Sequence, residues 1–130
     1  MVDEQVKKIL LKLGWAIASE AKKNIVKNKS VDTGMLMNSI QVEQQEDGTV
    51  IVGSKLEYAP AIEFGTRPHY PPETPIKEWA HRKLGLHGEE LEQATKSIQW
   101  KIYHYGTPSA PYLRPAINKA PELLRNILRE

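Results

Sequence analysis

Apolar side chains recur every three or four residues through the first part of the chain, from residue 3 to residue 28. Lysines fill many of the positions between them, so the pattern predicts an amphipathic helix with one apolar face. Asp3 and Glu4 suit the start of this helix and the later lysines suit its end, given the direction of the helix dipole. The apolar positions are Val6, Ile9, Leu10, Leu13, Ile17, Ala21 and Ile25.

The predicted helix is long for a chain of 130 residues. At about 1.5 Å per residue it would run roughly 39 Å, which is longer than a domain of this size is wide. Either Gly14 bends the helix, or one end projects and packs on something else. The second case would be a first sign of a partner.

A β-hairpin is predicted after the helix. Residues 30–34 break the helical pattern, and we expect Asp32 or Thr33 to cap a short turn there, because both side chains accept hydrogen bonds from nearby backbone N–H groups. From Ser39 the apolar period falls to two on both sides of a polar tip at residues 46–48. This tip contains an Asp-Gly pair, which is typical of a type I′ hairpin turn.

A third extended segment is predicted from Tyr58 to Phe64. Pro60 cannot donate a hydrogen bond to a neighbouring strand, so this strand would lie at a sheet edge or at a bulge. Glu57 and Glu63 would then form its solvent-facing half.

The second half of the chain predicts proline-bearing loops and three helices. Residues 65–75 contain four prolines, which fix φ and remove donors, so we expect a stiff extended loop. Helices are predicted over residues 76–84 and 89–105, closed by Gly85 and Gly106. The apolar face of the second helix would contain Leu91, Ala94, Ile98, Ile102 and Tyr105.

A C-terminal helix follows another proline-bearing loop at residues 107–111. Pro115 suits the first helical position. Pro121 either kinks this helix or marks its true start, and the pattern favours neither. The chain contains no long internal repeat: residues 64–66 (Phe-Gly-Thr) and 105–107 (Tyr-Gly-Thr) echo each other, but they are too short to count as a duplication.

Composition predicts one compact domain. Hydrophobic residues make up 40% and charged residues 26%, so a core can form. There is no cysteine, which excludes a disulfide scaffold, a thiol nucleophile, cysteine zinc sites and iron–sulfur clusters. No apolar run approaches the roughly 20 residues of a membrane span, and the N-terminus lacks the layout of a signal peptide. We expect a soluble protein, made and kept in a cytoplasm-like compartment.

Charge is distributed unevenly along the chain. The net charge is +2, but residues 1–29 carry seven lysines and three acids, residues 30–66 carry one lysine and six acids, and residues 67–130 carry ten basic and seven acidic residues. An acidic middle and basic ends give faces of opposite sign. These faces either fold back on each other, which needs no partner, or steer head-to-tail contact between copies.

No pattern in the sequence supports catalysis or a bound cofactor. The histidines at positions 69, 81, 87 and 104 lack the spacing of a helical zinc site. Neither a Gly-x-Ser-x-Gly elbow nor a glycine-rich phosphate loop is present. Glu57 and Glu63 could pair for acid–base work, but an edge strand explains them more simply. We therefore predict that the protein is not an enzyme and that it binds neither a metal nor a cofactor.

Aromatic residues favour protein binding over nucleic-acid binding. Lysines of the first helix could contact phosphates, but aromatic residues do not interleave with them as on a base-stacking surface. Tyr70 and Tyr112 lie in the stiff loops, where aromatic side chains can bind a protein partner at low entropic cost. Trp15, Trp79 and Trp100 lie on predicted helices and are expected to be mostly in the core.

Four segments carry a resemblance when they are taken in order: residues 31–40 (Val-Asp-Thr-Gly-Met-Leu-Met-Asn-Ser-Ile), 50–54 (Val-Ile-Val-Gly-Ser), 58–69 (Tyr-Ala-Pro-Ala-Ile-Glu-Phe-Gly-Thr-Arg-Pro-His) and 110–116 (Ala-Pro-Tyr-Leu-Arg-Pro-Ala). Together they resemble a family of neck proteins of long-tailed bacteriophages, the head–tail joining or tail-completion components. The likeness covers nearly the whole chain. Residues from about 73 to 106 resemble only the longer members and would form an inserted helical pair.

The resemblance implies an α+β fold, with a small twisted antiparallel β-sheet packed against a long N-terminal helix, an inserted helical pair and a C-terminal helix. Residues 1–130 would form a single neck-protein domain. The resemblance implies a virion structural protein, assembled in the bacterial host cytoplasm, and no enzyme. It also implies a homo-oligomeric ring, expected to be a hexamer. The ring would lie between a phage head-completion or connector protein and a tail-terminator or tail-tube protein. Genome DNA would pass through its lumen without specific binding, and the protein would have no membrane partner.

Physical roles can be assigned to several matching residues. We expect Gly34, Gly53 and Gly65 to hold turns that a side chain would strain. Glu63 could pair with Arg67 or with Arg114, within one chain or across a subunit boundary, or form a solvated surface pair worth only about 0–1 kcal/mol. The full set expected at an interface or in a structural motif is Asp32, Thr33, Gly34, Tyr58, Glu63, Phe64, Gly65, Thr66, Arg67, Tyr70, Tyr112 and Arg114.

Ring closure by opposite charges is a further hypothesis. The acidic region 30–66 of one copy could meet a basic helix of the next, so reversing the charges of Lys22, Lys23 and Lys27 should disturb assembly and leave the fold intact. Two other functions stay open as alternatives: a tail-tube terminator, and a nucleic-acid-binding module. Steeply salt-dependent binding to random duplex DNA would favour the module.

Overall fold

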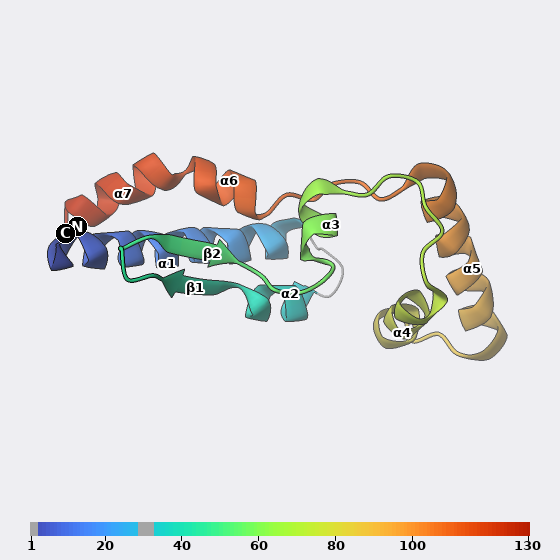
Figure 1. Ribbon diagram of the computed structural model, residues 1–130. Coiled ribbons are helices and arrows are strands. Elements are labelled where there is room, and N and C mark those ends of the chain that lie inside the picture. Colours follow the sequence, from blue (N-terminus) through green and yellow to red (C-terminus); the bar gives the residue numbers. More distant parts are fainter. Residues whose placement is uncertain (1–2, 29–32) are drawn as a thin grey trace. The chain divides into compact units, whose positions relative to one another are not determined.

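The computed structural model describes residues 3–28 and 33–130. The chain divides into two compact units: the first consists of residues up to Glu63 together with Ala110–Glu130, and the second consists of Phe64–Ser109. The α+β class is confirmed. The elements are α1 (Glu4–Asn28), α2 (Thr33–Ser39), β1 (Gln41–Gln44), β2 (Val50–Gly53), α3 (Ala59–Phe64), α4 (Glu73–Leu84), α5 (Gly88–Tyr105), α6 (Leu113–Asn118) and α7 (Ala120–Leu128) (Figure 1).

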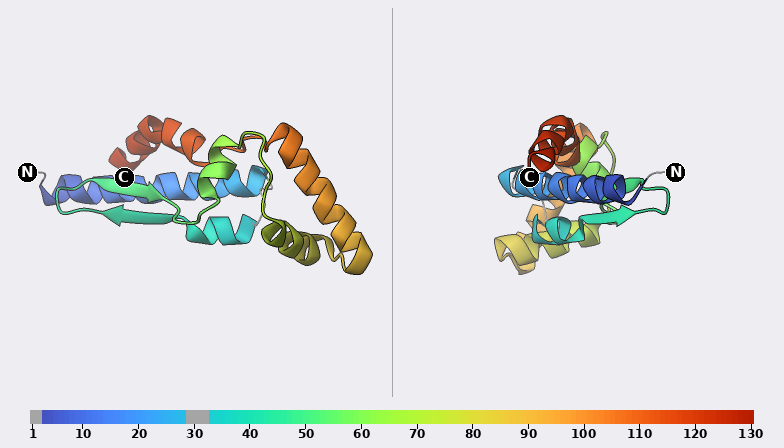
Figure 2. Two further views of the ribbon diagram at one scale, coloured as in Figure 1. Left: turned by 45° about the vertical axis from the view of Figure 1, so that its right-hand side comes forward. Right: turned by 90° about the vertical axis from the view of Figure 1, so that its left-hand side faces the viewer.

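Helix α1 is the central element of the first unit. It is one continuous helix of 25 residues, as the apolar spacing predicted. Asp3 caps its start, since Asp3 Oδ1 accepts a hydrogen bond of 2.9 Å from the Val6 N–H group. The β1–β2 hairpin packs on one side of α1, and α6 and α7 pack on another (Figures 1 and 2).

Gly14 allows close packing between α1 and the hairpin. It is buried in the helix, where an added Cβ atom would lie 2.5 Å from Val50 Cγ1 and 3.0 Å from Val42 Cγ1. The strands can reach this depth only because residue 14 has no side chain. The helix continues through the glycine, so the role suggested by the sequence, a bend, is not the one that the residue has.

Strands β1 and β2 form the predicted antiparallel hairpin, but its turn differs from type I′. The Gly48 N–H group donates to Gln45 O at 3.0 Å, and the Gln45 N–H group donates to Thr49 O at 2.8 Å, so the loop contains three residues. Gly48 has a φ of 95°. This is the form in which a type I turn is followed by a glycine in the left-handed region.

The third predicted strand is wrong, because residues 59–64 form helix α3. Pro60 explains the error. In the first turn of a helix a proline loses no hydrogen bond, and its fixed φ suits the helix. Helix α3 buries Ala59 and Glu63, which lie four residues apart on one face. Glu63 therefore points into the first unit and does not form the solvent-facing side of an edge strand.

Pro121 marks the start of a separate helix, which decides between the two possibilities that the sequence left open. Helix α6 ends at Asn118, and α7 begins at Ala120 with Pro121 in its first turn. The C-terminal helical region also begins two residues before Pro115, at Leu113. Both prolines therefore lie in first turns, where backbone N–H groups have no helical partner.

The core of the first unit is small. Its largest fully buried side chains are Ile25 from α1 and Leu36 from α2. The other buried members of the core are Ala18, Ala21, Ile40, Ala59, Tyr112 and Ala116. Trp15 stays outside this core and is 59% exposed, so the prediction that it is a core residue is wrong.

The second unit contains both of the helices predicted for its sequence. Helix α4 begins at Glu73, three residues earlier than predicted, because Pro75 is tolerated in its first turn. Gly85 ends α4 with a φ of 66°, and Gly106 ends α5 with a φ of 70°.

Polar residues are buried in the second unit, and each has a hydrogen-bond partner. Thr95 Oγ1 donates to Leu91 O at 2.7 Å, and Gln99 Nε2 donates to Pro71 O at 3.1 Å. Gln99 therefore ties the proline-bearing segment to α5.

Two aromatic residues of α5 that were expected inside lie at the surface. Trp100 is 56% exposed, and Tyr105 is more exposed still, whereas Trp79 on α4 is partly buried. The aliphatic residues predicted on the same face as Tyr105 are partly buried: Leu91, Ala94, Ile98 and Ile102. Across residues 3–28 and 33–130, no helix has the length and apolar character needed to cross a membrane.

Candidate functional site

The carboxylate of Glu63 closes the start of α6. Glu63 Oε1 accepts hydrogen bonds from the Tyr112 N–H group at 3.1 Å and from the Leu113 N–H group at 2.7 Å, and Oε2 accepts one from the Arg114 N–H group at 3.3 Å. The first N–H groups of a helix have no partner inside it, and Tyr112 makes no side-chain capping bond. The side chain of Glu63, which belongs to α3, therefore caps the N-terminus of α6.

Arg114 completes this cluster from α6. Its Nε donates to Glu63 Oε2 at 2.9 Å, and its Nη2 donates to the backbone O of Glu63 at 2.9 Å. The Glu63 side chain is 5% exposed and the Arg114 side chain is 51% exposed. Of the partners considered for Glu63, the structure thus selects Arg114 of the same chain, and the pair is not a solvated surface pair, because the Glu63 side chain is buried.

The electrostatics of the cluster keep Glu63 ionised. Burial raises the pKa of the Glu63 carboxyl, but hydrogen bonds from the Arg114 guanidinium and from the N–H groups of residues 112–114 outweigh it, so this pKa lies below its ordinary value. A buried carboxylate is tolerated when it is paired and hydrogen-bonded in this way. We call Glu63, Arg114 and the residue 112–114 backbone the Glu63 clamp, because they join α3 to the start of α6.

Tyr112 lies in the core, although its place in a stiff loop suggested an exposed interface residue. It is 3% exposed, and its Oη donates to Ala59 O at 3.3 Å. Two side chains of α1 hold the same loop: Asn24 Nδ2 donates to Tyr112 O at 3.0 Å, and Asn28 Nδ2 donates to Pro111 O at 2.9 Å. Sequence reasoning missed these two asparagines, because no local pattern links positions so far apart.

A tight crossing lies in the second unit, where residues 66 and 107 form an antiparallel bridge. The Thr66 N–H group donates to Thr107 O at 3.0 Å, the Thr107 N–H group donates to Thr66 O at 3.2 Å, and the two hydroxyl oxygens are 2.8 Å apart. Gly65, with a φ of 74°, would place an added Cβ 2.7 Å from Thr107 O, and a Cβ on Gly106 would overlap Thr66 O. The two Gly-Thr echoes in the sequence are therefore the two halves of this crossing.

The other glycines expected in strained turns do not need to be glycine. Gly34 lies in α2 and Gly53 ends β2; neither has a positive φ, and a Cβ on either would meet no atom within 4 Å. The prediction is wrong for these two residues and right for Gly65.

The remaining expected residues are spread over the chain. Tyr58 is partly buried against the core, while Phe64, Arg67 and Tyr70 are exposed. Thr33 begins α2, and Asp32 lies outside the described residues. The structure thus brings together Glu63, Tyr112 and Arg114 in the first unit, and Gly65 and Thr66 in the second.

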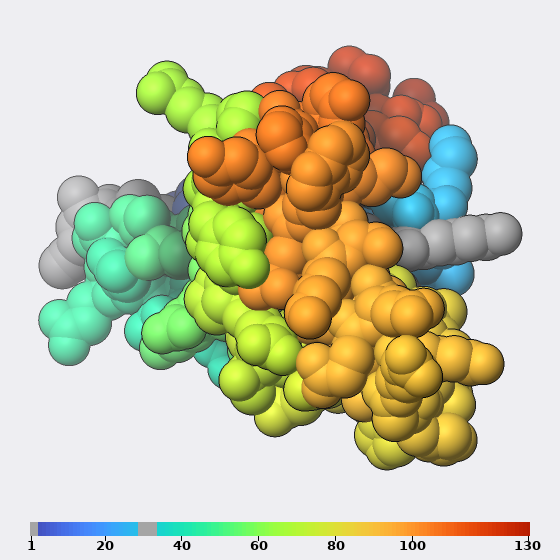
Figure 3. All heavy atoms as spheres, turned by 90° about the vertical axis from the view of Figure 1, so that its right-hand side faces the viewer, coloured from blue at the N-terminus to red at the C-terminus, as the bar shows by residue number. Residues whose placement is uncertain are grey.

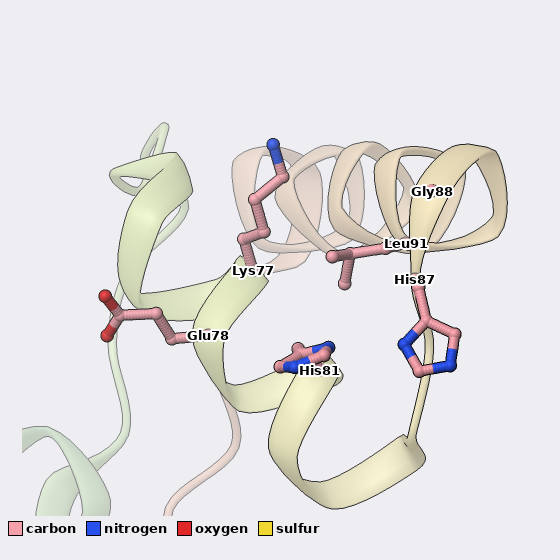
Figure 4. Close-up of a pocket in the computed structure, with 6 residues that line it drawn as sticks. All are labelled: Lys77, Glu78, His81, His87, Gly88 and Leu91. Carbon is pink, nitrogen blue, oxygen red and sulfur yellow. The ribbon is translucent and has the colours of Figure 1, made fainter.

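Each unit has a shallow depression on its described surface. The depression of the first unit is lined by Trp15, Ala18, Ser19, Lys22, Ile40 and Val42. The depression of the second unit lies between α4 and α5 and is lined by Lys77, Glu78, His81, His87, Gly88 and Leu91 (Figure 4). The His81 and His87 rings are 5.5 Å apart in an edge-to-face arrangement. In the part of the chain that the structure describes, no group of three or more His, Cys, Asp or Glu side chains could hold a metal ion.

Comparison with known proteins identifies the family. The HK97-gp10-like family model, described as "Bacteriophage HK97-gp10, putative tail-component", matches residues 1–65. The match contains α1, α2, the hairpin and α3, and it includes two of the four segments that carried the neck-protein resemblance and most of a third. No curated protein and no solved structure matches the chain significantly. With half of its length matched, the chain belongs to the HK97-gp10-like family of bacteriophage tail components.

Proposed function

We propose that this protein is a neck component of a long-tailed phage, in which identical copies form a ring that joins the head to the tail. Family membership supports a role in the tail. In the proposed role the ring has a head-completion or connector protein on one side and a tail-terminator or tail-tube protein on the other. The copies assemble in the host cytoplasm, and genome DNA passes through the ring without specific binding.

The observation that carries this proposal is the large apolar surface left open on both units. Trp15 on the first unit and Phe64 and Trp100 on the second are each more than half exposed. Large exposed apolar patches on soluble proteins usually mark interaction sites. Trp15 also borders a depression that Val42 and Lys22 line, so its exposed ring lies beside a mixed apolar and polar hollow. Such a subunit is completed by contact with its neighbours.

A closed ring requires two different faces on each copy that contact each other head to tail. The acidic residue 30–66 region and the basic regions on either side of it supply faces of opposite sign. We assign Phe64, Arg67 and Tyr70 to the contact surface because they are exposed, and we assign the Glu63 clamp to the rigidity of the subunit frame.

A phage with a stop codon in this gene tests the proposal. We expect lysates that contain DNA-filled heads and tails of normal length that are not joined, and we expect a plasmid copy of the gene to restore complete particles. Tails of abnormal length would instead favour a tail-tube terminator. Joined, infectious particles in the absence of the protein would contradict both roles.

A further inference from the structure

We propose that the exposed face of the β1–β2 hairpin in one copy docks on an aromatic and basic face of α5 in a second copy. The acidic hairpin face consists of Glu43, Glu46, Asp47 and Ile51. The α5 face consists of Lys96, Trp100, Lys101, Tyr103 and His104. This inference rests on the proposed self-assembly, and it names the two surfaces that meet.

The α5 face combines exposed rings with unpaired positive charge. Trp100 and Tyr103 are each more than half exposed, and the spheres of α5, in orange, lie open on the surface in Figure 3. Lys96 and His104 lie four residues before and after Trp100, so all three share one side of the helix. Lys96 and Lys101 form no ion pair with any residue in the described ranges, and residues 93–105 contain no acid.

The rings of this face are held in place before any partner binds. The Trp100 and His104 ring centroids are 4.2 Å apart, those of Tyr103 and His104 are 5.1 Å apart at 90°, and those of Tyr70 and Tyr103 are 6.1 Å apart at 71°. Fixed rings lose little entropy on binding, and Trp and Tyr are the residues most often found at the centre of protein interfaces. Because most of the rings pack edge to face, they do not form the open flat surface on which bases stack. The face therefore suits a protein better than a single-stranded nucleic acid.

The exposed face of the hairpin is acidic, whereas the α5 face is basic. Residues alternate between exposed and partly buried along β1 and from Val50 to Val52 of β2, so one side packs on α1 and the other side faces solvent. Glu43 and Ile51 are exposed and lie directly opposite each other in the antiparallel pair. Hydrogen bonds from Thr49 lower the pKa of Asp47 at the tip, so this carboxyl is charged at neutral pH. An apolar side chain beside carboxylates complements rings beside ammonium groups.

Helix α1 is the other basic helix, and it fits the hairpin less well. Several of its lysines already have partners in the same chain: Lys12 pairs with Glu130 at 3.5 Å, and Lys23 pairs with Glu20 at 3.5 Å. Its exposed aromatic side chain is Trp15 alone, because α1 contains no other aromatic residue. The contact of acidic and basic regions considered from the sequence is therefore assigned to α5.

Two charge-reversal variants test the contact. One is Lys96→Glu/Lys101→Glu, and the other is Glu43→Lys/Glu46→Lys; all four side chains are exposed, so the fold is expected to survive, as circular dichroism would check. Each variant alone should self-associate roughly 10- to 100-fold more weakly than the unchanged chain in sedimentation velocity. An equimolar mixture should recover association, because each variant then offers the face that the other needs. Failure of the mixture to recover would overturn the inference.

A matched control reverses two exposed lysines of α1 that lie outside the Trp15 depression, Lys8→Glu/Lys27→Glu, and it should leave association nearly unchanged. Trp100→Ala supplies a second measurement that changes no charge, and it should weaken association at least tenfold. If only the α1 variant abolished association, this docking would be wrong while the self-assembly stood. If Trp100→Ala abolished binding of an oligothymidine strand and left self-association unchanged, the α5 face would be a nucleic-acid-binding surface and the proposed docking would be wrong.

Discussion

Replacing Glu63 with glutamine removes the charge of the Glu63 clamp and keeps the shape of its side chain. The carboxylate accepts four hydrogen bonds, from the N–H groups of Tyr112, Leu113 and Arg114 and from Arg114 Nε. Glutamine has one oxygen and one NH₂ group at the same places. If the glutamine oxygen keeps the hydrogen bonds from the Tyr112 and Leu113 N–H groups, the NH₂ group faces the two Arg114 donors, and the two hydrogen bonds from Arg114 are lost.

The cost follows from the burial of the pair. Each hydrogen bond to a charged acceptor contributes about 1.5–3 kcal/mol when it is buried. The Arg114 side chain is half exposed and can turn toward water, which reduces the loss at that end. We therefore expect Glu63→Gln to lower the free energy of unfolding by about 2–4 kcal/mol. For a chain of this length this corresponds to a Tm lower by on the order of 10 °C.

Thermal and urea unfolding followed by circular dichroism measure this change. Glu57→Gln is the matched control, because Glu57 is an exposed carboxylate just before α3, and its Tm should stay within about 1–2 °C of the unchanged protein. If Glu63→Gln also unfolded within about 0.5 kcal/mol of the unchanged protein, the clamp would not be a main support of the fold.

Three further outcomes follow from single positions. Because folding lowers the pKa of Glu63, the ionised carboxyl contributes its full stabilisation above the ordinary glutamate pKa of about 4.3, and this stabilisation is lost as the pH falls through the lower folded value. The difference in Tm between the unchanged protein and Glu63→Gln should therefore shrink when thermal melts are run at acid pH. Gly14→Ala should cost about 1–3 kcal/mol, since the new methyl meets stiff valines, whereas Gly34→Ala in an open helical position should stabilise by up to about 1 kcal/mol in the same urea titration. Gly106→Ala should speed hydrogen exchange in the second unit far more than Gly85→Ala, because both have positive φ but only Gly106 lacks room for a Cβ.

Elements that depend on residues close together in the sequence were predicted correctly. The three- and four-residue spacing predicted α1, the alternation around an Asp-Gly tip predicted the hairpin, and Gly85 and Gly106 predicted the ends of α4 and α5. Pro60 misled the prediction of α3, because a proline is compatible with both an edge strand and the first turn of a helix.

Contacts between distant positions could not be predicted from the sequence. Glu63 was recognised as part of a motif, but its function as a cap for α6 depends on a backbone about fifty residues away. In the sequence, Gly14 suggested a bend in the helix. The reason for this glycine is the packed hairpin, which leaves no room for a side chain and which the sequence does not show. Trp15 and Trp100 were expected in the core on hydrophobicity alone, and this property does not separate a core from an interface.

Native mass spectrometry of the purified chain, over a wide range of concentrations, tests the self-assembly most directly. We expect a closed oligomer of one defined mass, with a population that rises with concentration and falls when the α5 or hairpin charges are reversed. A chain that stayed monomeric at every concentration, both alone and when mixed with the neighbouring head and tail proteins, would contradict this expectation.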